Sequence, residues 1–530
     1  MEIYNIAYNL YVQDGEHEPK QMTNFTPVIE TAYYPLESSQ DDIPAYLGIQ
    51  LILEDGSVRS LTLPMTSNLA RTIVAEEPRA VLLKTGYAPL VQKYIVDQLS
   101  KTGRSGECQR GVYLPGNGTY RLADGQHVTV WNGRVAGSTK LEVPYMIKPT
   151  NTYRITNSID RPVPTLVRTL LENDAALILP VTYAFLVSRR DVLTAEQHPL
   201  QGGLYITGVQ SSGKTTLARR VFGYTERIGI PGKAALVLEA VSTEASVRDT
   251  LSENPGCVVI IDDLAKSSSR TIEAHRKKLG GAMLRLAANE GDSTKKGKTG
   301  KTDHRDCTSG IALTAEFVLD GVSELTRSIF VYLEKKLNLT EDVRPALIGA
   351  ILEDFADWFA DNYEHAIELL HKIADSPDIL KNLRVDGADE FTELLTRERR
   401  IQDNLALLQW AFVCMVEMIK STVKLSPHRE QALYEKFWMA VHLSVSKQVD
   451  EFAKIRTHLK KGNIAHLLCE AIDCDEFQLC RKKSKLFKRN GIVWKEKNGV
   501  IKQVGIKQTA LVQFIRNQNG YQNYSSRKIT

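Results

Sequence analysis

The segment 208–215 combines residue types and a spacing that bind a chain of phosphates. It reads Gly208, Val209, Gln210, Ser211, Ser212, Gly213, Lys214 and Thr215. This is the pattern G-x-x-x-x-G-K-[ST], in which successive backbone N–H groups surround a β/γ-phosphate pair. Glycine permits positive φ angles and keeps side-chain atoms away from the anion. Lys214 is then placed to neutralise the phosphates, and the hydroxyl of Thr215 to ligate Mg²⁺.

The residues on either side predict that this loop joins a strand to a helix. Residues 204–207 have the pattern of a short buried strand, and residues 216–222 that of the first turns of a helix. The positive end of the helix dipole would add to the attraction for the anion, and we include Thr216 among the expected nucleotide contacts. A chance match in a glycine-rich turn is the alternative, and the strand–loop–helix setting argues against it.

An acidic pair at the end of another apolar segment supplies the second half of such a site. Residues 257–261 are apolar and rich in β-branched side chains, which is typical of a central strand in a parallel sheet. Asp262 and Asp263 follow directly. We expect Asp262 to hold Mg²⁺ through water and Asp263 to polarise the attacking water. Two acids after an apolar run are also a common way for a strand to end, so the pairing with the loop carries the argument.

The next segments predict a sensor and a basic hairpin. Residues 273–289 have a helical pattern, and residues 310–314 have that of a strand. Thr314 and Glu316, at the end of this strand, lie where a γ-phosphate sensor is expected. The Gly/Lys/Thr segment between helix and strand reads as an exposed hairpin whose lysines could contact a nucleic-acid backbone. These lysines are Lys295, Lys296, Lys298 and Lys301. A solvated charged loop is the alternative.

Arg327 directly precedes a further apolar segment, residues 328–333. This is where ring ATPases carry an arginine finger, a side chain that reaches the nucleotide bound by a neighbouring subunit. Such a residue can accelerate turnover by about 10³–10⁵. The alternative is an ordinary arginine beside a strand.

The C-terminal end of the chain carries a strong positive charge. Residues 481–530 contain 13 Lys and Arg against one acid, Glu496, which suits a polyanionic partner. Two strands are expected at 491–494 and 500–504 around a turn at 497–499, followed by a short helix at 509–516. This order predicts a winged-helix-like module that binds DNA through Lys482, Lys483 and Lys485. A basic solubilising tail is the alternative.

Length and composition indicate several domains. The chain has 530 residues, 43% hydrophobic and 25% charged, which favours three or four domains. The apolar stretch 175–187 is too short to span a bilayer, and no secretory signal is visible, so we expect a cytoplasmic protein without a membrane partner. Seven scattered cysteines fit free thiols. His466 with Cys469, Cys474 and Cys480 lacks the CxxC spacing of a zinc site.

The predicted fold class is α/β, with a P-loop nucleotide-binding core between other modules. We expect an N-terminal α+β module at 1–150, the ATPase core at 151–335, a helical lid or connector at 336–460, and the basic winged-helix-like domain at 461–530. The sequence does not declare the role of the N-terminal module.

The order of these motifs resembles the AAA+ core of phage and mobile-element replication proteins. It is most similar to the MCM-like helicases of staphylococcal cassette elements. The resemblance covers about residues 165–335 and is looser at 83–114. It rests on the phosphate loop, the acidic strand, the Lys-rich hairpin, the segment Leu313-Thr314-Ala315-Glu316 and the segment Leu325-Thr326-Arg327.

The resemblance implies an ATP-driven DNA helicase that forms a ring, expected to be hexameric, and uses ATP and Mg²⁺. Single-stranded or forked DNA would be its partner, and replication of a mobile element its setting. Each nucleotide would lie between subunits. Lys214, Thr215, Asp262 and Asp263 would come from one subunit and Arg327 from the next.

One residue departs from that family. The acidic strand usually ends in Asp-Glu, whereas this chain has Asp263 at the second position, and its carboxylate lies one methylene, about 1.5 Å, further back. Hydrolysis is then slow, or another group such as Glu316 holds the water. This departure favours a second hypothesis, an ATP-gated regulatory or defence-type switch without unwinding activity. A small-molecule kinase is weaker, because Arg327 and the basic C-terminal end would have no role.

Overall fold

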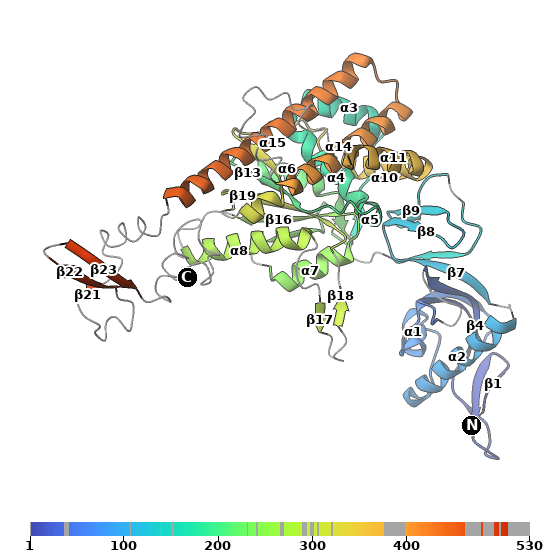
Figure 1. Ribbon diagram of the computed structural model, residues 1–530. Helices are drawn as coiled ribbons and strands as arrows, with labels where there is room; N and C mark the ends of the chain where they lie inside the picture. Colours follow the sequence, from blue (N-terminus) through green and yellow to red (C-terminus); the bar gives the residue numbers. More distant parts are fainter. Residues whose placement is uncertain are drawn as a thin grey trace. The chain divides into compact units, whose positions relative to one another are not determined.

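The computed structural model describes most of the chain and divides it into two compact units (Figure 1). The described residues are 2–36, 42–105, 108–138, 140–149, 153–230, 232–239, 242–264, 270–288, 294–296, 302–304, 307–319, 322–375, 398–461, 479–480, 492–497 and 500–506. The first unit comprises Met1–Thr152 with Ala356–Tyr363, and the second Tyr153–Phe355 with Glu364–Thr530.

A five-stranded sheet packed against two helices forms the core of the first unit. Its strand order is β11-β7-β4-β5-β6. The strands are β4 (Phe25–Pro35), β5 (Tyr46–Leu53), β6 (Val58–Pro64), β7 (Gln109–Leu114) and β11 (Tyr145–Ile147). Buried and half-buried side chains alternate along β5, as the pleat of a strand requires. The buried set packs with apolar residues of α1 (Leu69–Glu76) and α2 (Ala88–Ser105).

Two small antiparallel sheets complete this unit. One has the order β1-β2-β3 and the other β10-β9-β8. Their strands are β1 (Glu2–Ile6), β2 (Asn9–Gln13), β3 (Lys20–Gln21), β8 (Gly118–Arg121), β9 (His127–Trp131) and β10 (Arg134–Val135), and a 3-10 helix, η1 (Thr85–Tyr87), precedes α2. The first unit thus combines strands with helices, as an α+β module does.

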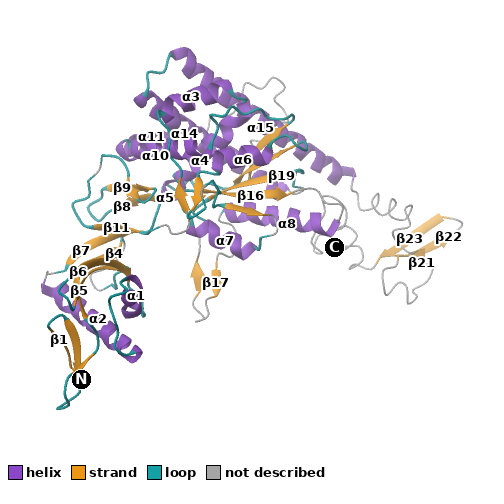
Figure 2. Ribbon diagram, turned by 180° about the vertical axis from the view of Figure 1, so that it is seen from behind, coloured by secondary structure: helices purple, strands orange, loops and turns teal. Residues whose placement is uncertain are grey.

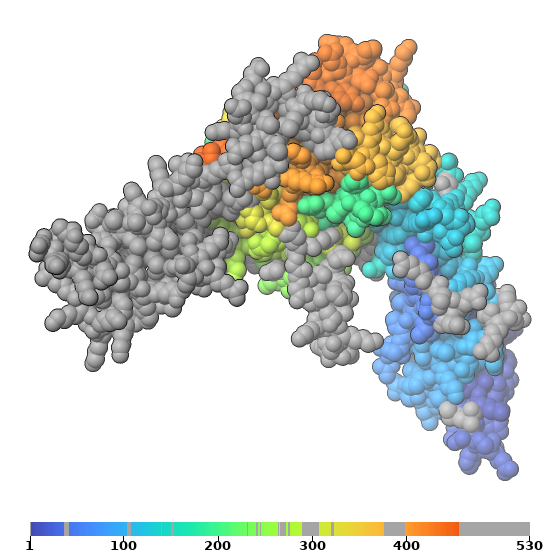
Figure 3. Space-filling view, viewed as in Figure 1, coloured from blue at the N-terminus to red at the C-terminus, as the bar shows by residue number. Residues whose placement is uncertain are grey.

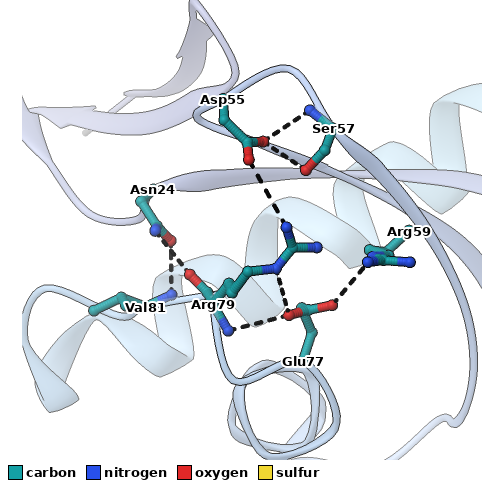
Figure 4. Close-up of polar contacts among 7 residues, drawn as sticks. All are labelled: Asn24, Asp55, Ser57, Arg59, Glu77, Arg79 and Val81. Atoms are coloured by element: carbon teal, nitrogen blue, oxygen red, sulfur yellow. Dashed lines mark hydrogen bonds and ion pairs between the residues drawn. The ribbon is translucent and has the colours of Figure 1, made fainter.

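A polar cluster fastens the segment after α1 to the β5–β6 turn (Figure 4). Arg79 donates from Nε to Glu77 Oε1 at 3.1 Å and lies 3.8 Å from Asp55. The hydrogen bond from Arg79 lowers the pKa of Glu77. Asn24 adds two bonds to the same segment: its side chain donates to the Arg79 carbonyl and accepts from the Val81 N–H. These polar contacts hold the segment 77–81 in place.

A five-stranded parallel sheet lies at the centre of the second unit. Its order is β15-β16-β19-β13-β20, so β13 is flanked by β19 and β20. The strands are β13 (Gly203–Gly208), β15 (Val237–Glu239), β16 (Val258–Leu264), β19 (Gly310–Ala315) and β20 (Ser328–Leu333). Every neighbouring pair is parallel, so the carboxyl ends of all five strands meet at one edge. This edge is the usual place for a ligand in such sheets.

Helices cover both faces of this sheet. In Figures 1 and 2, α7 (Glu244–Glu253) and α8 (Arg270–Ala287) lie on one side, and α4 (Ile178–Ser188) and α6 (Lys214–Phe222) on the other. All eleven residues of α4 are buried, so it is a core helix with no solvent-facing side. Burial on both faces explains why the strands read as continuous apolar runs rather than as alternating ones.

The remaining helices are α3 (Pro162–Glu172), the 3-10 helix η2 (Ala175–Leu177), α5 (Arg190–Ala195), α9 (Val322–Thr326), α10 (Pro345–Asp361), α11 (Tyr363–Ala374), α14 (Arg399–Thr422) and α15 (Pro427–Lys461). Of these, α14 and α15 pack against both α4 and β20. Among the described residues, α14 alone is long and apolar enough to cross a membrane, and 67% of its apolar window is buried inside the fold. The described residues from Pro345 to 460 are mainly helical, as expected, whereas residues 336–344 are not.

Four short strand pairings lie outside the central sheet. The strand β12 (Tyr153–Ile155) pairs with β14 (Thr225–Arg227), β17 (Thr294–Lys296) with β18 (Thr302–His304), β21 (Leu479–Cys480) with β22 (Ile492–Lys497), and β22 with β23 (Val500–Ile506). The β17–β18 and β22–β23 pairs are the two hairpins that the turn signals predict. The expected helix at 509–516 lies outside the described residues.

Two element boundaries differ from the sequence-based expectation. The helix after the phosphate loop begins at Lys214 rather than at Thr216, because the loop's last glycine already serves as its N-cap. The acidic strand does not end before Asp262 but continues to Leu264. Its register with β19 shifts between Ile261 and Leu264, so an irregularity of the ladder coincides with the two acids.

Candidate nucleotide-binding site

The phosphate loop leaves β13 through a backbone that only particular residues adopt. The φ angles are +151° at Gly208, +60° at Ser211 and +95° at Gly213. A Cβ on Gly208 would lie 2.2 Å from the carbonyl oxygen of Leu333. The same carbonyl accepts a hydrogen bond from the Val209 N–H at 3.2 Å. The close approach of β13 to β20 therefore fixes the start of the loop.

Lys214 folds back over the loop. Its side chain is largely buried, and Nζ donates to the carbonyl oxygens of Val209 at 2.7 Å and Gly208 at 3.2 Å. Burial lowers the pKa of Lys214, and the charge of Glu316 acts in the opposite direction. Val209, Gln210, Ser211 and Thr216 are exposed around the loop. The ammonium group is thus held at the loop, with the tip of the loop open to solvent.

Asp262 is the centre of the site. Its carboxylate is 6% exposed and accepts hydrogen bonds at Oδ1 from Thr215 Oγ1 at 2.8 Å and Thr314 Oγ1 at 2.6 Å. These residues come from α6, β16 and β19, whose ends meet because α6 follows β13 and β19 lies between β13 and β16. The structure therefore brings together Thr215, Asp262 and Thr314, which the sequence analysis named as expected metal ligands and as an expected sensor.

Arg219 is a fourth member of this cluster, which the sequence analysis missed. Its Nη2 lies 3.0 Å from Asp262 Oδ2, and the arginine side chain is 58% exposed. Thr215 and Arg219 are four residues apart on α6, so they share one helix face. That spacing was the available signal, but only the position of β16 beside this face shows which acid the arginine meets.

The structure describes only one of the two acidic side chains that we expect to orient the attacking water. Asp263 belongs to β16, but its side chain lies outside what the structure describes. Glu316 follows β19, is half-buried, and donates its backbone N–H to the Leu264 carbonyl at 3.2 Å. Its effect on the pKa of Lys214 places its charge near that ammonium group. Glu316 is therefore a described carboxylate whose charge lies near the loop.

The residues present fit a phosphate chain with a hard divalent cation. The hydroxyl of Ser212 is buried and has no hydrogen-bond partner in the described part of the chain. An anion seated in the loop would satisfy it, as buried polar groups require. Thr215 and Asp262 offer hydroxyl and carboxylate oxygens, which are the ligands that Mg²⁺ takes.

Arg327 lies at the other end of the sheet. The register of β13 and β20 sets Ser328 beside Gly203 and Leu333 beside Gly208, so Arg327 is about 20 Å along the strands from the loop. Its side chain is 7% exposed, and Nη1 donates to the carbonyl oxygen and the hydroxyl of Ser323. The structure does not bring Arg327 to the phosphate loop of its own chain.

The expected DNA-binding lysines are only partly described. Lys295 and Lys296 lie on β17, with their backbone described and their side chains not. The other five lie outside the described residues, namely Lys298, Lys301, Lys482, Lys483 and Lys485. Nothing about their contacts follows from the structure.

Comparison with known proteins gives one informative match. No protein-family model matches the chain, and no curated protein does. A solved structure described as "SCCmec type IV Cch - active helicase" aligns over 98% of this chain and 90% of its own, with a TM-score of 0.53 at 12% identity. The two proteins share a fold. The resemblance to the staphylococcal cassette helicases therefore holds at the level of fold.

A second match is much weaker. An inhibitor-bound JCV helicase aligns over 50% of this chain and 65% of its own, with 10% identity and a TM-score of 0.20. At that score the likeness carries no argument about this chain.

Proposed function

We propose that this chain is an ATP-driven DNA helicase of a mobile genetic element that works as a ring, with each nucleotide bound between two copies. The observation that carries the proposal is the Asp262 cluster. One buried carboxylate joins Thr215 of the phosphate loop to Thr314 on the neighbouring strand, within a fold shared with an active helicase. A phosphate loop beside a buried carboxylate and two hydroxyl groups suits ATP with Mg²⁺.

The residues at the loop have separate tasks in this proposal. The backbone of residues 208–215 and the Lys214 ammonium group bind the phosphates, and Thr215 with Asp262 holds Mg²⁺. The cation neutralises charge that builds up on the phosphates during transfer to water. Thr314 keeps Asp262 oriented through its 2.6 Å hydrogen bond and senses the terminal phosphate. Asp263 or Glu316 orients the attacking water.

Arg327 completes the site of a neighbouring copy. Arg327 is too far along the strands to reach the loop of its own chain. In a ring, two neighbouring copies meet through different surfaces, so the arginine of one copy can face the loop of the next. Burial against Ser323 means that the guanidinium has to be released when the neighbour binds its nucleotide. A hexameric ring is the assembly we propose.

DNA binding is assigned to the lysine-rich hairpin and to the winged-helix-like domain. Lys295, Lys296, Lys298 and Lys301 would contact a single strand, and Lys482, Lys483 and Lys485 of the winged-helix-like domain would contact the duplex or fork. Each neutralised phosphate makes binding more sensitive to salt. The proposed domain limits remain 1–150, 151–335, 336–460 and 461–530.

A second function has its own support. The ion pair between Arg219 and Asp262 occupies the carboxylate that Mg²⁺ needs, and Asp263 is shorter than the usual glutamate. Both features suit a regulatory switch that binds ATP and changes its assembly without unwinding DNA.

Strand displacement on a forked duplex, measured together with ATP hydrolysis, tests the proposal. We expect hydrolysis that single-stranded DNA stimulates, unwinding of the fork, and loss of both in Lys214→Ala. Lys233→Ala, which changes an exposed lysine of the same unit, should behave as the wild type. ATP binding without unwinding would favour the switch, and a monomer that ignores DNA would contradict both functions.

A further inference from the structure

A second cluster of metal-binding side chains lies away from the phosphate loop. Atoms of His198, His371 and Asp375 that can ligate a metal all lie within 4.8 Å of one another. His198 Nε2 is 3.4 Å from Asp375 Oδ1, and His371 Nδ1 is 3.9 Å from Asp375 Oδ2. Glu196 stands behind His371, with its Oε2 3.2 Å from His371 Nε2. The nucleotide mechanism uses none of these four side chains.

Local structure holds the cluster in place. His371 is on the last turn of α11, and Asp375 is four residues later, with its N–H bonded to the His371 carbonyl at 3.0 Å. His198 follows α5, and its N–H bonds to the Leu193 carbonyl at 2.8 Å. In Figure 3, the surface of α11 (gold) adjoins that of the segment around α5 (green). Two segments distant in sequence thus present their donors to one point.

We propose that His198, His371 and Asp375 bind one Zn²⁺ ion, and that Glu196 orients His371 by accepting a hydrogen bond from its Nε2. Two donor atoms that each lie about 2.0–2.1 Å from a tetrahedral Zn²⁺ are about 3.3 Å apart, close to the 3.4 Å between His198 and Asp375. A carboxylate behind a ligating imidazole is the usual arrangement in metal sites, because it fixes the tautomer and the ring orientation. Here it leaves Nδ1 facing the other two donors.

The donor set and exposure select the kind of cation. Two imidazoles favour zinc and similar transition metals over Mg²⁺, which prefers oxygen ligands. His371 is 45% exposed and Asp375 63%, so water can supply a fourth ligand. The carboxylates of Asp375 and Glu196 lie directly against the two imidazoles, so negative charge faces the point where the cation would bind.

Zinc at this place would fasten α11 to the segment that enters β13. That segment is already bonded to α14, since the Gln201 N–H donates to Asn404 Oδ1 at 3.0 Å and Arg400 Nε donates to Gln201 Oε1 at 3.1 Å. Arg400 also reaches Thr326, next to Arg327. The ion would therefore stiffen the amino end of β13. This inference does not depend on the proposed helicase activity.

Metal binding to the full-length protein tests the proposal without reference to activity. The chelator-treated protein, with Cys469, Cys474 and Cys480 changed to Ser to remove competing thiolates, is titrated with Zn²⁺ in a calorimeter. We expect one equivalent to bind, at least 100-fold more weakly in His198→Asn and in His371→Asn. Glu196→Gln should weaken binding by about 10–100-fold. His365→Asn, an exposed histidine on the same helix, is the matched control and should leave binding unchanged.

X-ray absorption of the Zn²⁺-loaded protein needs no variant in the cluster and covers the case in which a variant fails to fold. We expect a first shell of nitrogen and oxygen that includes two imidazoles. No binding by the titrated protein, binding that survives in both histidine variants, or a first shell without two imidazoles would overturn the proposal.

Discussion

The two ends of β13 use the same backbone device for different purposes. At the carboxyl end a Cβ on Gly208 would lie 2.2 Å from the Leu333 carbonyl, and at the amino end a Cβ on Gly202 would lie 2.2 Å from the Arg327 carbonyl. Both ends are therefore pressed against β20. Beyond them the chemistry differs. The carboxyl end opens into an exposed loop, whereas the amino end packs Arg327 into its own fold.

In the proposed function this difference means that one chain supplies the loop of a nucleotide site and a neighbour supplies the arginine. The loop lies beside Thr215, Asp262 and Thr314, and both threonine hydroxyls are bonded to Asp262. Arg327 is separated from them along the strands and bonded to Ser323. In the proposed ring the carboxyl end of β13 would bind the nucleotide, and a neighbour would rearrange the amino end. The predictions below test each half of this comparison.

The largest effect is expected from Arg327→Ala. Turnover should fall by about 10³–10⁵, because a finger stabilises charge only in the transition state, while ATP binding to the loop stays near the wild-type value. Steady-state hydrolysis and binding of a fluorescent ATP analogue measure the two. Arg429→Ala, an exposed arginine on α15, is the control. Parallel loss of binding and turnover would show that the residue serves the fold and not a neighbour's site.

At the carboxyl end, Thr314→Val removes a donor to the buried Asp262 carboxylate. We expect the free energy of unfolding to fall by about 1.5–3 kcal/mol, the range for hydrogen bonds to charged groups. Thr314→Ser keeps the hydroxyl and should lose much less. Chemical denaturation of the two variants checks this. A Thr314→Val variant as stable as the wild type would contradict a contribution of this hydrogen bond, whatever the loss in Thr314→Ser.

The two glycines offer a direct comparison of the ends. Both Gly208→Ala and Gly202→Ala should destabilise the second unit, since each Cβ would overlap a backbone carbonyl, that of Leu333 in β20 or that of Arg327 just before it. Gly208→Ala should cost about 1–3 kcal/mol more, because its φ of +151° is strained for any residue with a side chain. Thermal unfolding measures the difference. An equal drop in Tm would show that the steric overlap alone, and not the φ angle of Gly208, sets the loss of stability.

The smallest effect concerns the ion pair over Asp262. Arg219→Ala should lower the Mg²⁺ concentration for half-maximal ATP binding by about two- to fivefold, which corresponds to about 0.4–1 kcal/mol and lies within the range for an exposed pair. Arg219→Lys keeps the charge and should stay near the wild type. An increase in the Mg²⁺ requirement of Arg219→Ala would mean that the arginine supports the site instead of competing for its carboxylate.

Local patterns were enough to predict the parts of the site that lie next to one another in sequence. Each of three parts is recognised from a few consecutive residues. These parts are the loop, the apolar strand before Asp262 and Asp263, and the strand that carries Thr314. The three-residue strand β15 was not predicted, because so short a segment has no measurable periodicity. The helix start at Lys214 was missed for a similar reason, since a loop glycine served as its cap.

Contacts between distant segments could not be read from the sequence. Arg219 contacts Asp262 because β16 lies beside α6. Arg327 donates a hydrogen bond to the carbonyl of Ser323 on α9. The histidines of the proposed zinc site lie on separate helical segments. Their spacing in sequence resembles no metal motif, whereas His466 with its three cysteines drew attention by residue type alone.

The central claim is that two copies share one nucleotide site, and mixing two inactive variants tests it most directly. Lys214→Ala lacks a working loop and Arg327→Ala lacks the finger, so each alone should be inactive. In an equal mixture about a quarter of the interfaces combine an intact loop with an intact arginine, and DNA-stimulated ATP hydrolysis should return. A mixture that assembles but stays as inactive as either variant alone would contradict the account.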